Sequence, residues 1–463
     1  MYYDSPLSKW NLSELLTWID LKFIASDDSS DVENYCSLMG AYEICTMFRG
    51  IVPVVHGPIG CTSSFYATRI ATRLRDKIKP MPFSSCMDSN DIIFGAIGKL
   101  ENTIKEVVNL YKPKLIVVLT TCVSDMITED VDSLIRKLKG TSNTDIISIN
   151  IGGISCKGFR QGADIAFKAL MDFVKEKNPN TEKEENSINL FLRRINGKLS
   201  DSEDIQEISR ILSINGIKIN TIVKVGATFD DLMKIPKAKV NASLCYTYGK
   251  EVMGHMKNLF DQPYCDKSYP IGLTPTLNWV GSITSLLSLE NKFEKSEEIT
   301  DVTNKLNKLK SFLHSKLDKK EMFIWHPGEK ALAFSRLAYD LELEPVLIGF
   351  TYHLISVTRE TIIRMLNEGY DPKCIIRGHS KLWDTYNEEL PFEKRPMLFM
   401  PKRFWVGNLP CVDLDLFRDS VLGISGLNKI IDEIYDLYSN GETENNSIFN
   451  RYFERRYEEV SWK

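Results

Sequence analysis

The sequence has no apolar run near the roughly 18–20 residues that a membrane-spanning helix needs. Its first residues, MYYDSPLSKWNLSELL, lack the basic-then-apolar order of a secretory signal. With a net charge of −4 and 26% charged residues, the chain has no excess of positive charge to attract a nucleic acid. We therefore expect a cytoplasmic protein with no membrane and no nucleic-acid partner.

Several common catalytic motifs are also missing. We find no Walker A loop, no GxGxxG fingerprint and no HExxH pair, so any nucleotide hydrolysis must come from another chain. None of the ten cysteines forms a CxxC pair, and a chain of 463 residues is not a small disulfide scaffold. The cysteines are therefore expected to be buried thiols or metal ligands.

Short apolar runs alternate with helical patterns along nearly the whole chain. The runs are PVVHGPIGC, KLIVVLTTC, DIISINIGG, INLFL, INTIVKVG, EMFIWHPG, PVLIGF and CIIRGH. Continuous apolar runs of this length are typical of strands that are buried on both faces. The helical patterns between them include DIIFGAIGKLENTIKEVVNLY, QGADIAFKALMDFVKEK, SEDIQEISRILSIN and TRETIIRMLNEGY. This alternation predicts an α/β fold with parallel sheets.

Two polar segments, around 175–187 and 290–320, interrupt the series, and the second predicts a charged surface helix. We expect three Rossmann-like parallel-sheet domains after an N-terminal extension. The boundaries predicted are 1–30 for the extension, 31–186 and 187–318 for the first two domains, and 319–463 for the third with its C-terminal helices.

Three cysteines lie where ligands bind in such a fold. Ligands of open parallel sheets sit beyond the carboxyl ends of the strands. Cys61 and Cys122 follow apolar runs directly, and Cys245 follows the shorter run KVNASL. A thiolate in the GPIGC turn lies close to backbone N–H groups and a helix N-terminus, which stabilise its negative charge. Taken singly, each cysteine also fits a buried structural thiol.

Cys36 lies 25 residues before Cys61 in an irregular segment. Thiolates are the usual ligands of iron–sulfur clusters, so Cys36, Cys61 and Cys122 together predict such a cluster. Three thiolates are one fewer than the usual four. We therefore expect another chain or a ligand other than cysteine to complete the site.

These residues also carry a family resemblance. The segments CSLMGAYEICTMFRGIVPVVHGPIGC, DSNDIIFGAIGKLENTI, LTTCVSDMITEDV and SCKGFRQGADIAFKAL resemble the α-type subunits of nitrogenase component 1 and its relatives. The resemblance covers about residues 30–435. It implies that Cys36, Cys61 and Cys122 bind a cluster of the 4Fe–4S or 8Fe–7S type at the interface with a homologous β-type subunit, in an α2β2 heterotetramer. It also implies a separate ATP-dependent iron protein as electron donor.

A second site is implied by the segment DDLMKIPKAKVNASLCYTYGKEVMGHM, which is similar to the family segment that anchors the catalytic cofactor. The resemblance makes Cys245 the terminal iron ligand of a group of the iron–molybdenum cofactor or L-cluster type, in a central cavity between the three domains. It also places Arg69 and Lys381 at the cofactor. The presence of Cys245 argues against the branch that reduces protochlorophyllide, because that branch lacks this thiolate.

The sequence departs from nitrogenases at the cofactor. Asp164 and Lys168 stand where the family has a glutamine and a histidine, and Leu422 stands where it has a histidine that binds molybdenum or vanadium. Leucine cannot bind a metal, so we expect an all-iron cofactor and negligible dinitrogen reduction. Lys168, Asp164 and His353 are the catalytic candidates, with Lys168 or His353 as the proton donor.

The other histidines and cysteines have weaker signals. His56 is expected to be a hydrogen-bonded core residue. The third-domain histidines His326, His353 and His379 either face a shared cleft as proton donors or belong to the core. Five more cysteines are expected to be structural, namely Cys86, Cys156, Cys265, Cys374 and Cys411. Cys86 and Cys156 are the first exceptions to consider, because they fall in family-like segments near the predicted clusters.

We predict the α-type subunit of a nitrogenase-like reductase that acts on a small-molecule substrate. The methylthio-alkane reductases have the cofactor cysteine together with altered proton donors. This similarity favours cleavage of a carbon–sulfur bond as the reaction. The alternative is a cofactor-assembly scaffold subunit that holds and matures a cluster. A third possibility is a sugar- or nucleotide-binding α/β protein with cysteines only in its core.

Overall fold

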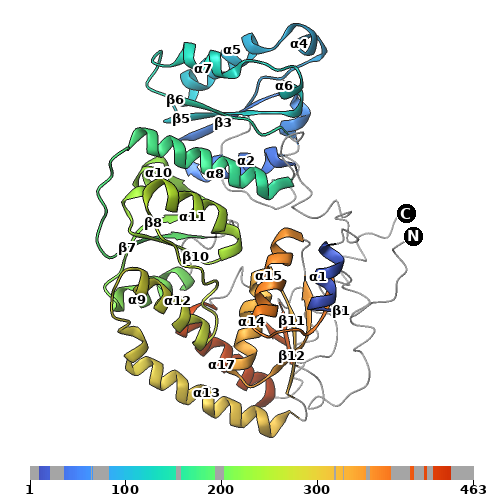
Figure 1. Ribbon diagram of the computed structural model, residues 1–463, viewed down its shortest axis with the longest axis vertical. Helices are drawn as coiled ribbons and strands as arrows, with labels where there is room; N and C mark the ends of the chain where they lie inside the picture. The colour runs from blue at the N-terminus through green and yellow to red at the C-terminus, as the bar shows by residue number, and fades with distance from the viewer. Residues whose placement is uncertain are drawn as a thin grey trace, which may run out of the picture.

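The computed structural model describes residues 10–20, 36–63, 65, 83–152, 158–192, 203–317, 320–326, 328–350, 355–376, 397–400, 411–413 and 421–439. Figure 1 shows three sheets, the first at the top, the second below it and the third at the lower right. Helices cover the sheets, and no helix in the described ranges is both long and apolar enough to cross a membrane.

The first sheet has four parallel strands. Across the sheet they are β4 (Phe83–Ser84), β3 (Ile51–His56), β5 (Leu115–Thr120) and β6 (Asp145–Ile149). Every residue of β3 and β5 is buried, because helices cover both faces of the sheet. One face packs against α5 (Ile97–Tyr111) and α7 (Val131–Leu138), and the other against α2 (Ser37–Cys45) and α8 (Gly158–Lys177).

The second sheet has three parallel strands, in the order β10 (Val240–Ser243), β7 (Ser187–Phe191) and β8 (Lys218–Val223). Its helices are α9 (Glu203–Ile214), α10 (Phe229–Lys234), α11 (Tyr246–Phe260) and α12 (Leu273–Leu286). A two-stranded parallel sheet joins the first two units, because β2 (Phe48–Arg49) pairs with β9 (Ala227–Thr228).

The third sheet has six strands, of which five are parallel. These five are, across the sheet, β13 (Lys373–Ile376), β12 (Glu344–Phe350), β11 (Glu321–Trp325), β14 (Met397–Met400) and β15 (Cys411–Asp413). The sixth strand, β1 (Trp10–Asn11), pairs antiparallel with β13 at the edge. The helices of this unit include α1 (Leu12–Asp20), α14 (Gly328–Asp340), α15 (Ile355–Asn367) and α17 (Gly423–Ser439).

The strand orders give each sheet a topological switch point. In each sheet the first parallel strand along the chain lies inside, with the next strand on one side and a later strand on the other. The switch points therefore lie between β3 and β5, between β7 and β10, and between β11 and β14. Ligands of open α/β sheets bind beyond the carboxyl ends of the strands at such points.

The predicted α/β class and the parallel sheets are confirmed. The charged surface helix is α13 (Glu297–Lys316), which buries one stripe of leucine and valine side chains. The helical pattern over DIIFGAIGKLENTIKEVVNLY forms two helices, because α4 (Ser89–Phe94) ends at Gly95 and α5 begins at Ile97. Gly95 has a φ of +89°, a conformation that interrupts a helix and that side chains other than glycine rarely adopt. The predicted N-terminal extension contributes β1 to the third sheet.

Candidate functional site

The turns that follow β3 and β5 lie side by side at the first switch point. His56 and Thr120, the last residues of these strands, are partners in the ladder. The Thr121 hydroxyl donates to the His56 carbonyl over 3.0 Å. A Cβ at Gly57 would lie 2.4 Å from the Thr121 side chain, so only glycine allows the two turns to approach this closely. The sequence after each turn brings a cysteine to this edge.

Cys61 and Cys122 are held by short helical turns. Cys122 is the first residue of α6 (Cys122–Met126), where Thr121 and Ser124 form a capping box. The Cys61 backbone N–H donates to the Pro58 carbonyl over 3.0 Å. Cys61 therefore lies in the helical turn that follows β3, and Cys122 lies at the start of the helix that follows β5.

Cys36 reaches the same edge from α2. It is the N-cap residue of α2, and the next residue, Ser37, donates its hydroxyl to the Ile151 carbonyl just beyond β6 over 2.9 Å. Glycine allows α2 to press against α8, since a Cβ at Gly40 would lie 1.8 Å from the Phe159 carbonyl oxygen. A Cβ at Gly162 would likewise lie 1.9 Å from the Ser37 carbonyl oxygen. This helix contact fixes the position of Cys36.

The three thiols, which we call the cysteine triad, interact electrostatically. Burial raises the pKa of Cys61, and the neighbouring Cys36 and Cys122 raise it further. Cys36 and Cys122 are exposed and Cys61 is half-buried. In the described ranges, no three His, Cys, Asp or Glu side chains are placed to hold one metal ion.

A buried polar network lies at the end of β3, next to the turn that carries Cys61. The fully buried His56 contacts the Ser85 hydroxyl through Nδ1 over 3.0 Å and the Glu129 carboxylate through Nε2. Glu129 also accepts the backbone N–H groups of Ala96 and Ile97, the latter over 3.1 Å. Burial lowers the pKa of His56 by more than Glu129 raises it, so the imidazole is neutral. The expectation that His56 is a hydrogen-bonded core residue is confirmed.

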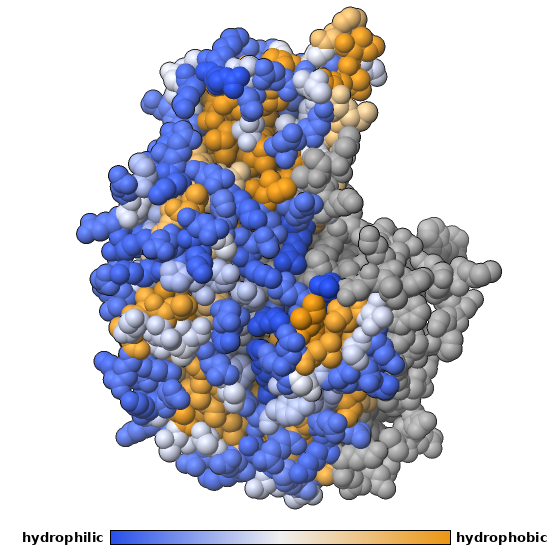
Figure 2. Space-filling view, viewed as in Figure 1, coloured by the Kyte–Doolittle hydropathy of each residue, from blue (hydrophilic) through white to orange (hydrophobic). Residues whose placement is uncertain are grey.

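An exposed apolar surface lies next to the triad. Ile92, Ile93 and Phe94 at the end of α4 are 47%, 73% and 85% exposed, and we call them the apolar tip. Ile59 and Met126, from the two turns that carry Cys61 and Cys122, are 67% and 71% exposed. Figure 2 shows hydrophobic residues gathered at the upper right, where Figure 1 places α4. Large contiguous patches of exposed apolar surface are typical of interaction sites.

Cys245 lies apart from the triad, at the switch point of the second sheet. It follows β10, is the N-cap residue of α11 and is 3% exposed. Its backbone N–H donates to the Ser243 hydroxyl over 3.2 Å, and that hydroxyl lies 2.8 Å from the Cys245 carbonyl oxygen. The thiol therefore sits in a buried turn whose backbone is held by hydrogen bonds.

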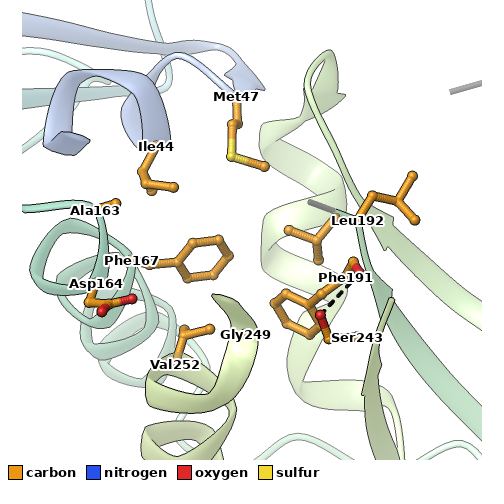
Figure 3. Close-up of a pocket in the computed structure, with 11 residues that line it drawn as sticks. Ile44, Met47, Ala163, Asp164, Phe167, Phe191, Leu192, Ser243, Gly249 and Val252 are labelled. Carbon is orange, nitrogen blue, oxygen red and sulfur yellow. Dashed lines mark hydrogen bonds between the residues drawn. The ribbon is translucent and has the colours of Figure 1, made fainter. Parts of the chain in front are cut away.

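A pocket opens beside this turn. Figure 3 shows Phe167 of α8 and Phe191 of β7 projecting toward it. The lining residues include Ser243 and Gly249, on either side of Cys245 in sequence, but not Cys245 itself. The remaining lining residues are Ile44, Met47, Ala163, Asp164, Phe167, Phe191, Leu192, Val223 and Val252. The pocket is thus largely apolar, with Asp164 as the charged residue of its lining.

Asp164 and Lys168 have different surroundings. Burial raises the pKa of Asp164 to about 6, against the opposing effect of the Arg160 guanidinium, whose Nε lies 3.9 Å from the carboxylate. Lys168 forms an ion pair of 3.1 Å with Glu251 of α11 and is not part of the pocket lining. The other three predicted residues of this site lie outside the described residues; they are Arg69, His353 and Lys381.

The position of Leu422 is buried in the apolar core. Leu422 is 3% exposed, and its backbone N–H donates to an Asp204 carboxylate oxygen over 2.9 Å. Glu207 accepts the next N–H groups at the start of α17, from Ile424 and Ser425. The groups at this turn are thus leucine and two carboxylates that are already hydrogen-bonded.

Two of the cysteines expected to be structural, Cys265 and Cys374, are buried and protonated. Burial raises the pKa of Cys265 to about 11 and that of Cys374 to about 12, and such thiols are poor metal ligands. Cys45, which had no predicted role, is equally buried and its pKa is raised to about 12. Cys86 is exposed in the loop after β4 with a φ of +51°. Cys156 lies outside the described residues, and Cys411 begins β15.

Comparisons with known proteins find relatives over most of the chain. The family model described as nitrogenase component 1 type oxidoreductase matches residues 36–393. The nitrogenase iron-molybdenum cofactor biosynthesis protein NifE of Clostridium pasteurianum is 26% identical over 330 residues, which is 70% of each chain. One of the subunits of the light-independent protochlorophyllide reductase from a Synechococcus species is 23% identical over 429 residues, 87% of this chain and 82% of that one. The structure of nitrogenase Cp1 at pH 5 shares the fold, with a TM-score of 0.59 and 18% identity over 90% of each chain.

Proposed function

Since the chain belongs to the family of nitrogenase component 1 type oxidoreductases, we propose that it is the α-type subunit of a nitrogenase-like reductase. It pairs with a homologous β-type subunit in an α2β2 heterotetramer and receives electrons from an ATP-dependent iron protein. It reduces a small-molecule substrate, with carbon–sulfur bond cleavage as the first reaction to test. The proposal is based on the residues of two sites, the cysteine triad and Cys245.

The observation that supports it most is the grouping of the cysteine triad at the first switch point. Burial, Cys36 and Cys122 all raise the pKa of Cys61, so a bare Cys61 thiolate at this edge needs a positive counter-charge. An iron–sulfur cluster supplies that charge and takes up single electrons when bound. Cys36 and Cys122 are exposed, which leaves them accessible to ligands from a partner chain. The triad therefore suits a cluster shared across a subunit interface.

The apolar tip is the proposed docking site of the iron protein. Ile92, Ile93 and Phe94 project from α4, which follows the strand next to the one that leads to Cys61. The chain has no nucleotide-binding motif of its own, so the ATP-dependent partner must approach the triad from outside. An apolar contact at this edge brings an electron donor near the cluster.

The second site is proposed to hold an all-iron cofactor at Cys245. The thiol is buried beside the largely apolar pocket that Ser243, Gly249 and Asp164 help to line, and its burial limits the access of water to a group bound there. Asp164, with its pKa near 6, changes between its protonated and ionised forms close to neutral pH and can hold a proton for the substrate. It therefore replaces Lys168 as the main proton-donor candidate, because Lys168 is engaged by Glu251.

The test is electron uptake by the complex of both subunits, prepared without oxygen. With the iron protein and ATP, the wild-type complex should be reduced and should consume electrons when a thioether substrate is added. The Cys61→Ala variant should bind the iron protein but accept no electrons from it. Full reduction of the Cys61→Ala complex at the wild-type rate would reject the proposed electron path.

The relatives favour a second candidate, an assembly scaffold that matures a cluster and passes it on. The match to NifE over 70% of each chain is the observation behind it. A scaffold should lose iron and sulfide to an apo acceptor protein during incubation, whereas a reductase should keep its iron through many turnovers. The neighbouring genes separate the candidates further, since a reductase should lie beside its own iron-protein gene.

A further inference from the structure

The third switch point holds a buried histidine that no part of the proposed function uses. His326 follows β11 directly, where the sheet order changes between β11 and β14. The side chain is 1% exposed, and its ring packs against Phe334 of α14 with 4.4 Å between the ring centroids. Within the described residues its Nε2 atom has no hydrogen-bond partner. Buried polar atoms are nearly always hydrogen-bonded, so an imidazole nitrogen without a partner points to a missing ligand.

The turn that carries His326 meets the turn that carries Cys245. Tyr269 links them, since its backbone N–H donates to the Leu244 carbonyl over 2.8 Å and its ring lies 5.9 Å from the Lys330 ammonium. Arg364 provides a second link. Its guanidinium lies 5.1 Å from the centre of the Tyr246 ring and pairs with Glu329 over 2.5 Å. The residues next to Cys245 and those next to His326 therefore share their contacts.

The surroundings of His326 suit an anionic metal group. Lys330 is only 4% exposed and lies in the first turn of α14, whose N-terminus adds a partial positive charge. A neutral imidazole has a lone pair to donate to a metal, and imidazole suits iron.

We propose that His326 is a second protein ligand, through Nε2, of the iron–sulfur group that Cys245 binds. The inference rests on the proposed function, because it needs a metal group at Cys245. The bond is a lone-pair donation to iron, with no electron or proton transferred. It would supply, from the end of β11, the imidazole that is missing at Leu422, and Lys330 would balance the negative charge of the sulfides.

The test is electron spin echo spectroscopy of the reduced complex, produced with ¹⁵N-labelled histidine. The wild-type complex should show a ¹⁵N coupling from a nitrogen bound to iron, and the His326→Ala variant should lose it. The His255→Ala variant is the matched control, because His255 is partly exposed on α11 and pairs with Asp172 instead. It should keep the coupling, as should Cys61→Ala. Adding ¹⁵N-imidazole to an unlabelled His326→Gly complex should restore the coupling.

The outcomes separate this inference from the proposed function. Absence of an iron-bound ¹⁵N coupling in the wild type, or an unchanged coupling in His326→Ala, overturns the inference. If His326→Ala fails to fold, the wild-type spectrum and the rescue by imidazole still decide it. If Cys245→Ala removes iron while His326→Ala changes nothing, the proposed function stands and the inference fails. An unchanged iron content in Cys245→Ala contradicts the proposed function itself.

Discussion

The ionisation of Asp164 depends on the fold. Its pKa is about 6 in the folded protein and about 4 in an unfolded chain, so the folded state binds the extra proton between these values. The free energy of unfolding of the apoprotein should therefore fall as the pH rises from 4 through 6, because ionisation is harder in the folded state. Below pH 4 the residue is protonated in both states and carries no penalty.

The Asp164→Asn variant removes this penalty. We expect it to be more stable than the wild type by about 2–3 kcal/mol at pH 8, from roughly two pKa units at about 1.4 kcal/mol each. The gain should vanish near pH 4. Urea unfolding at pH 4, 6 and 8 measures it, with Asp172→Asn on the same helix as control, since Asp172 is 56% exposed. Equal stability of wild type and Asp164→Asn at pH 8 would show that the folded state does not raise the pKa of Asp164.

Glu129 connects the apolar tip with the triad. Its carboxylate accepts the Ala96 and Ile97 N–H groups and contacts His56, and all of these groups are buried or half-buried. Removing it in Glu129→Ala leaves buried polar groups without partners, which should lower the free energy of unfolding by about 3–5 kcal/mol. Denaturant unfolding is the measurement. The Glu101→Ala control removes a carboxylate that pairs with Lys105 and Lys137 on the surface, and it should change stability little.

At the scale of the element, α4 ends in apolar side chains that are exposed to solvent in the isolated chain. Phe94 is 85% exposed, so Phe94→Ser should leave the free energy of unfolding nearly unchanged. Reduction by the iron protein should nevertheless slow more than roughly tenfold, because loss of an interface anchor costs more than about 1.4 kcal/mol. The control is Leu110→Ser, a 74% exposed residue of α5. If Phe94→Ser is reduced as fast as Leu110→Ser, the tip is not the docking site.

The contact between α2 and α8 depends on glycine. A Cβ at Gly162 would meet the Ser37 backbone at 1.9 Å, so Gly162→Ala must push α2 away from α8. We expect a loss of about 1–3 kcal/mol in stability and a loss of iron from the triad, because Cys36 caps α2. In the Gly98→Ala control, a Cβ meets nothing within 4 Å, and the helix α5 should gain about 0.5–1 kcal/mol. Thermal unfolding and iron analysis test both variants, and equal iron content in the two would argue against a role of this contact at the triad.

The elements themselves were largely predictable from local patterns. Runs such as LIVVL are apolar throughout, and this composition is typical of strands that are covered on both faces. The break at Gly95 was missed because a single glycine inside a helical pattern is a weak signal until its φ is known. The strand β1 could not be predicted, because its pairing with β13 joins residues more than 350 positions apart.

For the whole molecule, the order of the strands decided what the sequence could reveal about the site. Cys61 and Cys122 follow long apolar runs, so their place at a sheet edge could be inferred from the sequence. The pocket beside Cys245 and the partner of Lys168 could not, because they depend on how α8 packs against α11. His326 also follows a strand, but the sequence cannot tell it from an ordinary core histidine. The structure is needed to show that its side chain is buried and that Nε2 has no hydrogen-bond partner among the described residues.

The central claim is that one chain holds two separate iron–sulfur groups, one at the cysteine triad and one at Cys245. Mössbauer spectroscopy of the ⁵⁷Fe-enriched complex of both subunits tests it most directly, comparing wild type with Cys61→Ala and Cys245→Ala. The wild type should show two sets of iron signals, with one set lost in Cys61→Ala and the other in Cys245→Ala. A single set of signals in the wild type, or the loss of the same set in both variants, would contradict the claim.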